Sequence, residues 1–338
     1  MILFSPEQFK TELVDTTAND FEAKALALFQ YQAEHNPVYR QYITALRILP
    51  AQVQNMTQIP FLPIDCFKYH KIQTLNPTAL AGKQVVRVFE SSGTTGQINS
   101  KHYVSDLDFY EHISLHGFEE QYGSIQNYHI LALLPSYLER SNSSLVYMVE
   151  AFMRKSQSID SGFYLQNIPE LLQKINLLRI QSDRKILLIG VTFALLDLAE
   201  QFEPNLEEVI VMETGGMKGR RKELIREELH EILCGKLNVN NIHAEYGMTE
   251  LRSQAYSKGE GIFSLPAWCK VLLREVHDPL DYSMTRTSGI VNIIDLANVE
   301  SCAFIATQDL AIKTADNTFK IIGRADNSDI RGCNLLVY

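Results

Sequence analysis

The chain has 338 residues, of which 46% are hydrophobic, and it carries 31 basic and 40 acidic side chains, a formal net charge of −9. This length and apolar content suffice to bury a large core in one or two domains, and they exclude an intrinsically disordered chain. An acidic chain without a Lys/Arg block also argues against nucleic acid as a partner.

Neither the apolar stretches nor the cysteines suggest export or a membrane span. The longest apolar stretch, residues 186–196, is too short to cross a bilayer, and the first ten residues lack the pattern of a signal peptide. The five cysteines are scattered and form no C-x-x-C pair, which argues against a disulfide framework and a Cys-rich zinc site. We therefore predict a soluble cytoplasmic protein.

In chain order, the predicted elements begin with a helix over residues 20–35 and a Pro-punctuated irregular connection, IPFLPIDCFKYH, at 59–70. Apolar runs then predict strands at 84–90, 129–135, 185–190, 207–212 and 241–247. Helices are predicted at 105–121, from 143 onward, at 192–202 and at 221–234. Ser105 with Asp108 forms a capping-box signature for the first of these. Alternating strands and helices indicate a largely parallel sheet with helices on both faces.

Beyond residue 248 the pattern changes to short strands, in VLLREV, GIVNIIDL, FIAT, LAIKT and FKIIGR. We therefore predict three regions. They are an N-terminal helical region at 1–80 packed on the main body, an α/β nucleotide-binding core at 81–250, and a β-rich subdomain at 251–338.

Three polar, glycine-bearing segments each follow a predicted strand. They are FESSGTTGQINSKHY at 89–103, ETGGMKGR at 213–220 and AEYGMTEL at 244–251. The first combines glycines, which permit positive φ, with hydroxyl side chains, so it suits an anion such as phosphate, although a solvated turn has the same composition. It is not a Walker A loop. Three such loops at the carboxyl ends of strands are the usual geometry of a site in an open α/β sheet.

The order of four motifs, SSGTTG, EYGMTE, TQDLA (307–311) and GRADNSDIRG (323–332), resembles the acyl-adenylating (ANL) superfamily. With IPFLPIDCFK, LPSYLERSNSSL (134–145) and TGGMKGR, the chain most resembles the LuxE-type acyl-protein synthetases, which are related to phenylacetate-type CoA ligases. The resemblance implies a large α/β body with mostly parallel sheets flanked by helices and a small β-rich subdomain. Superfamily members continue past the hinge motif, which corresponds to GRADNSDIRG, into a mobile lid domain, which we expect to be absent here.

The resemblance also implies roles for individual residues. The loop that holds the β- and γ-phosphates of ATP corresponds to Ser91, Ser92, Gly93, Thr94, Thr95 and Gly96. The segments beside the adenine and the α-phosphate correspond to Gly215, Gly216, Tyr246, Gly247, Met248 and Thr249. Glu250 matches the acidic residue that helps to hold Mg²⁺, Asp309 the carboxylate that accepts from the ribose hydroxyls, and Arg324 the hinge arginine near the ribose. The segment that borders the acyl pocket corresponds to Ser136 and Tyr137.

Two further residues carry chemistry in this interpretation. The family loop usually runs G-x-P-K, whereas Gly96 is followed by QINSK, so Lys101 is only a loose match to the family lysine. LuxE-type enzymes carry the acyl group as a thioester on a cysteine near the carboxyl terminus, which corresponds to Cys333. Thiolates are strong nucleophiles, although the commonest fate of a free cysteine is to be a small buried hydrophobe.

The resemblance thus implies an ATP- and Mg²⁺-dependent ligase that adenylates a carboxylic acid, in this family a fatty acid. The acyl group would pass to Cys333 as a thioester and then to an acyl-CoA-reductase-like protein partner. Two alternatives stay open. One is an acyl- or aryl-CoA ligase that uses coenzyme A as acceptor, and the other is a non-catalytic nucleotide- or acyl-binding scaffold.

Overall fold

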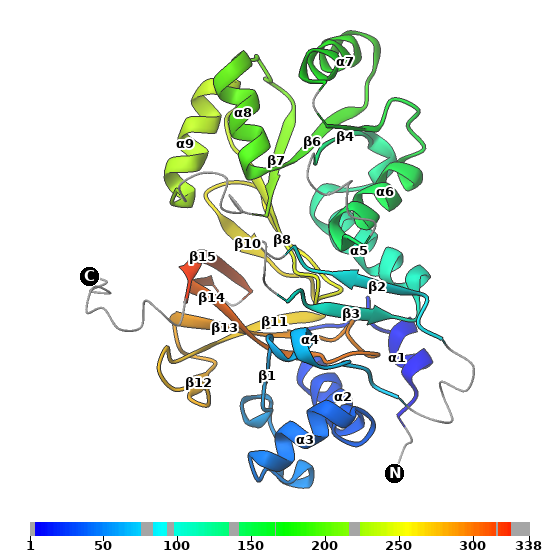
Figure 1. The fold of residues 1–338 in the computed structure, drawn as a ribbon, viewed down its shortest axis with the longest axis vertical. Helices are drawn as coiled ribbons and strands as arrows, with labels where there is room; N and C mark the ends of the chain where they lie inside the picture. Colours follow the sequence, from blue (N-terminus) through cyan, green and yellow to red (C-terminus); the bar gives the residue numbers. More distant parts are fainter. Residues whose placement is uncertain are drawn as a thin grey trace. The chain divides into compact units, whose positions relative to one another are not determined.

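Two compact units make up the chain in a computed structural model, which describes residues 4–75, 84–92, 98–134, 142–165, 167–215, 224–315 and 317–325. Unit 1 comprises Met1–Val86, His102–Ser105 and Ala267–Tyr338, and unit 2 comprises Arg87–Lys101 and Asp106–Pro266. Both units contain α-helices and β-strands (Figure 1).

Unit 2 is built on a mostly parallel sheet. Its five parallel strands run in the order β5 (Gly162–Tyr164), β4 (Tyr128–Leu133), β6 (Lys185–Val191), β7 (Ile210–Thr214) and β8 (His243–Tyr246). Beyond β8 the sheet continues with two antiparallel strands, β9 (Ala255–Ser257) and β10 (Ile262–Ser264). All six residues of β4 are buried, as expected for a strand covered on both faces.

Helices cover both faces of this sheet. They are α5 (Leu107–Tyr122), the 3-10 turn η3 (Ile125–Asn127), α6 (Ser144–Ser156), α7 (Ile168–Gln181), α8 (Thr192–Phe202) and α9 (Arg226–Leu237). Figure 1 shows α5 and α6 on one side of the central strands and α8 and α9 on the other, and α8 packs on both β6 and β7. A mostly parallel sheet flanked by helices confirms the predicted α/β class.

Several predicted boundaries were wrong by a few residues, and two of the errors matter for the site. The strand expected at 207–212 is β7 (Ile210–Thr214), so Glu213 and Thr214 end a strand instead of opening a loop. The helix expected to begin at 221 is α9, which begins at Arg226. The capping residue of α5 is Asp106, whose side chain accepts from the Phe109 N–H, and not Ser105.

Unit 1 contains an antiparallel sheet. Its strands run in the order β12 (Tyr282–Ser283), β11 (Cys269–Arg274), β13 (Ser288–Asp295), β14 (Phe304–Ala315) and β15 (Thr318–Arg324). The short strand β1 (Leu62–Pro63) pairs in parallel with β14. A separate two-stranded sheet consists of β2 (Arg87–Glu90) and β3 (Lys101–Val104).

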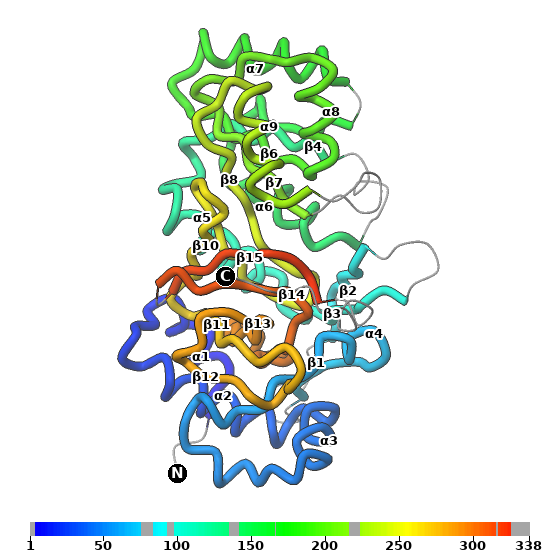
Figure 2. Tube along the Cα trace, turned by 90° about the vertical axis from the view of Figure 1, so that its left-hand side faces the viewer, coloured from blue at the N-terminus to red at the C-terminus, as the bar shows by residue number. Residues whose placement is uncertain are grey.

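The N-terminal helices belong to the same unit as these C-terminal strands (Figure 2). They are α1 (Pro6–Thr11), α2 (Phe21–His35), α3 (Pro37–Ala45) and α4 (Cys66–Tyr69), with 3-10 turns η1 (Pro50–Gln52) and η2 (Met56–Gln58). Buried Gln32 on α2 donates to the Asn298 carbonyl at 2.8 Å and accepts from the Ala303 N–H at 2.9 Å. Lys10 forms a buried ion pair with Glu300, so charged as well as amide side chains fasten the helices to the strands.

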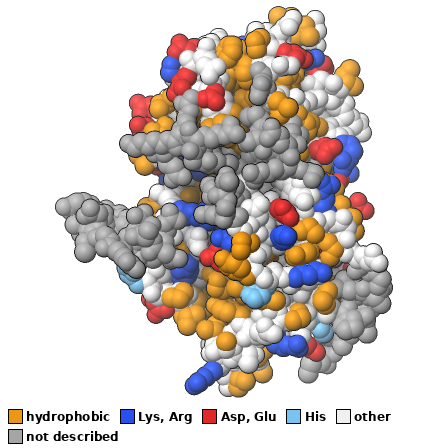
Figure 3. Space-filling view, viewed as in Figure 1, with side chains coloured by type: hydrophobic (Ala, Val, Ile, Leu, Met, Phe, Trp, Pro, Cys, Tyr) orange, Lys and Arg blue, Asp and Glu red, His pale blue; other side chains and the backbone are white. Residues whose placement is uncertain are grey.

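Among the residues that the structure describes, no helix is long and apolar enough to cross a bilayer. On the face shown in Figure 3, the described Lys/Arg and Asp/Glu side chains are scattered among hydrophobic ones.

Candidate nucleotide site

Two of the predicted adenine-side segments begin at adjacent strand ends in unit 2. Strands β7 and β8 are parallel neighbours, with Thr214 opposite Glu245, so Gly215 and Tyr246 lie at the same edge of the sheet. Gly215 has φ of +71°, a conformation that favours glycine. Gly247 is needed for space, because a Cβ there would lie 2.3 Å from Glu245 Oε1. The structure therefore brings these two segments together, as the sequence predicts.

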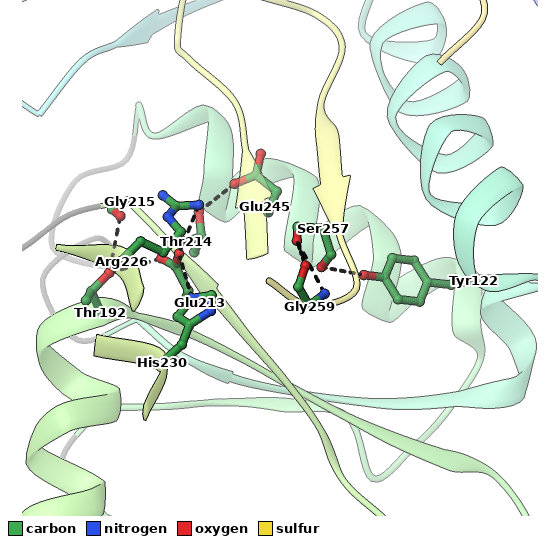
Figure 4. Close-up of polar contacts among 10 residues, drawn as sticks. All are labelled: Tyr122, Thr192, Glu213, Thr214, Gly215, Arg226, His230, Glu245, Ser257 and Gly259. Atoms are coloured by element: carbon green, nitrogen blue, oxygen red, sulfur yellow. Dashed lines mark hydrogen bonds and ion pairs between the residues drawn. The ribbon is translucent and has the colours of Figure 1, made fainter. Parts of the chain in front are cut away.

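A buried carboxylate lies at the base of the Gly215 turn. Glu213, at the end of β7, is only 2% exposed. Its Oε1 lies 3.4 Å from Arg226 Nη1 and 3.6 Å from His230 Nε2, both on α9. Figure 4 shows these three side chains meeting. A neighbouring cation offsets the cost of burying a carboxylate this deeply, and Arg226 supplies that cation.

The Glu213 cluster is connected to the Gly215 turn through Thr192. The Thr192 hydroxyl, at the start of α8, lies 3.2 Å from Glu213 Oε2 and 3.2 Å from the Gly215 carbonyl oxygen (Figure 4). A hydroxyl has a single hydrogen, so it donates to one of these acceptors at a time. The turn is thereby tethered to a buried ionic cluster.

Arg226 also reaches the second segment. Its guanidinium lies 4.8 Å from the centroid of the buried Phe263 ring, and the Phe263 and Tyr246 rings are 5.7 Å apart. Gly261 leaves room for this arginine, since a Cβ there would lie 2.9 Å from Arg226 Cδ. One arginine therefore supports the neighbourhoods of both Gly215 and Tyr246.

Glu245 occupies the opposite face of the sheet from Glu213. It is 8% exposed, and its Oε2 accepts from the Thr214 hydroxyl at 2.5 Å. Burial raises the pKa of Glu245 from 4.5 to about 7; the Thr214 hydrogen bond opposes the rise and the Glu213 charge adds to it. Close to neutral pH this carboxyl therefore exists in both its neutral and its ionised form.

The segment after Gly247 ends in a buried acidic residue. Glu250 is 5% exposed, and the Leu251 N–H donates to the Met248 carbonyl at 3.1 Å, which makes a tight turn. Within the described ranges, no group of three or more His, Cys, Asp or Glu side chains could hold a metal ion. A single carboxylate still suits Mg²⁺, which is usually held by one or two carboxylates together with substrate phosphate oxygens.

The predicted phosphate loop is described only at its ends. Ser91 and Ser100 hold these ends together, because the Ser91 N–H donates to the Ser100 carbonyl at 3.0 Å and the Ser100 N–H donates to Ser91 Oγ at 2.9 Å. Lys101 is 48% exposed, and its Nζ lies 3.7 Å from Glu90 Oε1. Several predicted residues lie outside the described ranges: Gly93, Thr94, Thr95, Gly96, Ser136, Tyr137, Gly216 and Cys333.

The two predicted ribose residues lie in unit 1 and are cross-strand partners. Asp309 on β14 faces Arg324 on β15 in the strand register. The Asp309 N–H donates to Thr307 Oγ1 at 3.1 Å, and Arg324 Nη2 donates to Gln308 Oε1 at 3.1 Å. The structure therefore makes cross-strand neighbours of one residue from the TQDLA motif and one from the GRADNSDIRG motif.

Sequence reasoning missed the residues that support these segments. The missed residues are Glu213, Arg226, His230, Glu245 and Gln308. Two of them left a signal, because Glu213 and Glu245 are acidic residues of the glycine-bearing segments 213–220 and 244–251, and each lies at or within a strand. An acidic residue at such a place is unusual for a buried strand, and it points to a polar function or to a buried partner.

The described cysteines have the surroundings of structural residues. Cys269 and Cys302 are buried, and Cys66 and Cys234 are half-buried. Burial raises the pKa of the Cys302 thiol to about 12, and burial also raises the pKa of the Cys66 and Cys234 thiols. A raised pKa lowers the thiolate fraction, so these thiols are poor nucleophiles.

Searches against protein-family profiles and against curated protein sequences find no match to this chain. Solved structures do match. A 2-hydroxyisobutyryl-CoA ligase in complex with 2-HIB-AMP and CoA aligns with a TM-score of 0.63 at 13% identity, over 96% of this chain and 73% of the ligase. The O-succinylbenzoate coenzyme A synthetase of Bacillus subtilis, in complex with AMP, aligns with a TM-score of 0.51 at 16% identity, over 73% of this chain and 50% of the synthetase.

ATP-bound MatB from Rhodopseudomonas palustris aligns with a TM-score of 0.51 at 16% identity, over 86% of this chain and 58% of MatB. The chain has the fold of these proteins. Two of the three are CoA ligases or synthetases by name, and all three were solved with an adenine nucleotide or an adenylate. At such low identities the similarity concerns the fold alone, which supports the predicted α/β architecture.

Proposed function

We propose that this protein is an ATP-dependent acyl-protein synthetase. It adenylates a carboxylic acid of the fatty-acid type and transfers the acyl group to its own Cys333 as a thioester, for delivery to a reductase partner. The observation that carries the proposal is that Gly215 and Tyr246, which opens the Tyr246–Glu250 segment, lie at one edge of the sheet in a fold shared with CoA ligases. Carboxyl ends of parallel strands are where ligands bind in open α/β sheets.

The chemistry proceeds in two balanced steps. In the first, a carboxylate oxygen attacks the α-phosphorus of ATP, the bond to the bridging β-phosphate oxygen breaks, and pyrophosphate leaves. In the second, the Cys333 thiolate attacks the acyl carbonyl carbon, the bond to the AMP oxygen breaks, and AMP leaves. Mg²⁺ bound to the phosphates, with Glu250 as a protein ligand, would offset the charge that accumulates on pyrophosphate.

The remaining residues bind and orient the nucleotide in this proposal. Ser91, Ser92 and the glycine-bearing stretch from Gly93 to Gly96 donate hydrogen bonds to the β- and γ-phosphates. Gly215 and Gly216 let the adenine approach the backbone closely, and Asp309 accepts from the ribose hydroxyls. Lys101 is exposed and pairs with Glu90, so we assign it only a supporting charge near the phosphates.

A second candidate, a CoA ligase, is favoured by a specific observation. The solved structures with this fold include a ligase captured with both an acyl-adenylate and CoA. In that case the acceptor would be free coenzyme A, and Cys333 would have no catalytic role. Both candidates share the adenylation step, so they differ only in the thiol that takes the acyl group.

The test is intact-protein mass spectrometry after incubation with ATP, Mg²⁺ and a panel of acids, together with ATP–pyrophosphate exchange. We expect the protein to gain the mass of one acyl group. Cys333→Ser should lose this adduct while exchange continues, and Cys234→Ser, which changes a half-buried thiol on α9, should keep both. If the adduct survives Cys333→Ser, the acceptor assignment is wrong. If acyl-CoA forms on addition of coenzyme A and no adduct is seen, the CoA ligase is correct.

A further inference from the structure

The IPFLPIDCFK segment has no role in the proposed function, yet it lies along the strand that carries TQDLA. In the β1–β14 pairing, Leu62 is opposite Ile305 and Pro63 is opposite Ala306. The Ile64 N–H continues the pairing by donating to the Ala306 carbonyl at 2.9 Å. The next residue, Asp65, is therefore held beside Gln308, which precedes the predicted ribose carboxylate.

Four side chains form a relay from this segment to the hinge motif. Lys68 Nζ lies 2.7 Å from Asp65 Oδ1, and Gln308 Nε2 donates to Asp65 Oδ2 at 2.9 Å. On the other side of the amide, Arg324 Nη2 donates to Gln308 Oε1 at 3.1 Å. All four residues belong to unit 1, and the relay joins three of the motifs that the sequence singles out.

The chemistry of the relay fixes the direction of the Gln308 amide. An ionised Asp65 can only accept hydrogen bonds and a guanidinium can only donate them. The amide NH₂ must therefore face Asp65, and the amide oxygen must face Arg324. Turning the amide over would place its oxygen against the carboxylate and its NH₂ against the guanidinium, and both contacts would then be repulsive.

The amide orients Arg324 without neutralising it. A glutamate at position 308 would form an ion pair with the guanidinium, whereas the neutral amide leaves the positive charge of Arg324 intact. The backbone adds to this restraint, because the Ala325 N–H donates to the Gln308 carbonyl at 2.7 Å. In the strand register, Arg324 is opposite Asp309, so the residue that the amide restrains is the cross-strand partner of the predicted ribose carboxylate.

We propose that Gln308 is a positioning residue for recognition of the nucleotide ribose, acting through Arg324 and itself oriented by Asp65. The inference rests on the proposed function, in which Asp309 and Arg324 contact the ribose. It assigns a purpose to the IPFLPIDCFK segment, which supplies the carboxylate that keeps the amide in its productive direction.

The test compares the affinity for ATP with the affinity for 2′,3′-dideoxy-ATP, measured by isothermal titration calorimetry. The wild-type protein should bind ATP more tightly. Gln308→Ala should reduce the ratio of the affinity for ATP to the affinity for 2′,3′-dideoxy-ATP by at least about fivefold, chiefly by lowering the affinity for ATP. A hydrogen bond to a charged group contributes that much or more to binding. Asp65→Asn has nearly the same shape, but it can face the amide with either its oxygen or its nitrogen, so it should reduce the ratio in the same direction by a smaller factor.

Gln30→Ala is the matched control. It removes an exposed glutamine of unit 1 whose amide donates to the Pro50 carbonyl at 2.8 Å, and it should leave the ratio unchanged. If Gln308→Ala lowers the affinities for both nucleotides equally, or changes neither, the affinity ratio stays at the wild-type value. Gln308 then has at most a structural role, and the inference alone fails. If the wild-type protein binds both nucleotides equally, the ribose roles of Asp309 and Arg324 fail and the inference fails with them.

Discussion

Replacing Glu245 by Gln should make the protein more stable at alkaline pH while leaving it little changed in acid. Glu245 is 8% exposed, and burial raises the pKa of its carboxyl from 4.5 to about 7. Glutamine has the shape of the protonated acid, and its amide oxygen can still accept from the Thr214 hydroxyl. The substitution therefore removes the charge while the hydrogen bond is kept.

The sign and the size of the effect follow from proton linkage. Below pH 4.5 the Glu245 carboxyl is protonated in both the folded and the unfolded chain, so its ionisation has no effect on stability. Between 4.5 and about 7 the unfolded chain loses the proton and the folded protein keeps it, so the free energy of unfolding falls as pH rises. Above this window the ionised form destabilises the folded protein by about 3 kcal/mol, from about 1.4 kcal/mol for each pKa unit.

Urea unfolding of both proteins at about pH 5 and about pH 8 measures this difference. The stability advantage of Glu245→Gln over wild type should be about 2 to 3 kcal/mol larger at the higher pH. Other titrating groups are common to both proteins and cancel in this comparison. Glu231→Gln, on the exposed side of α9, is the control and should show no such change. An advantage of Glu245→Gln that is the same at both pH values would refute the reasoning.

Two further predictions concern packing and charge. Lys10→Met should lower the free energy of unfolding by about 3 to 5 kcal/mol, because it removes the cation that pairs with the buried Glu300 carboxylate. Lys236→Met breaks an exposed ion pair and should change the free energy of unfolding by less than about 1 kcal/mol in the same urea titration. Gly247→Ala should destabilise by about 1 to 3 kcal/mol, since its Cβ would meet a buried carboxylate oxygen at 2.3 Å. Gly235 lies in α9, and a Cβ there would meet nothing within 4 Å, so Gly235→Ala should instead stabilise the folded protein by about 0.5 to 1 kcal/mol. Equal effects of the two alanine substitutions in thermal melts would contradict the steric argument.

The sequence by itself determined the order and type of the main elements. Apolar runs such as the one that forms β4 are local signals, because a strand covered on both faces needs apolar residues at every position. Alternation with amphipathic helices then implied a parallel sheet, and a parallel sheet implied that the segments after β7 and β8 share an edge. The glycines at 215 and 247 could also be singled out from the sequence, because the backbone conformation and the close approach that require glycine depend on a few neighbouring residues.

Only the tertiary structure decided which polar side chains meet. Ser105 and Asp106 offer similar capping chemistry, and the choice of Asp106 became visible only in the fold, where Ser105 donates to Glu300 instead. Gln32 finds its acceptor 266 residues further along the chain.

The partners of Glu213 come from α8 and α9, and Gln308 is oriented by a segment close to the other end of the sequence. The periodicity of apolar residues indicates which face of an element is buried, but it does not select the partner, because many helix faces could pack against the same apolar surface. A buried carboxylate or amide accepts very few partners, and those partners are selected by the three-dimensional packing of the whole unit.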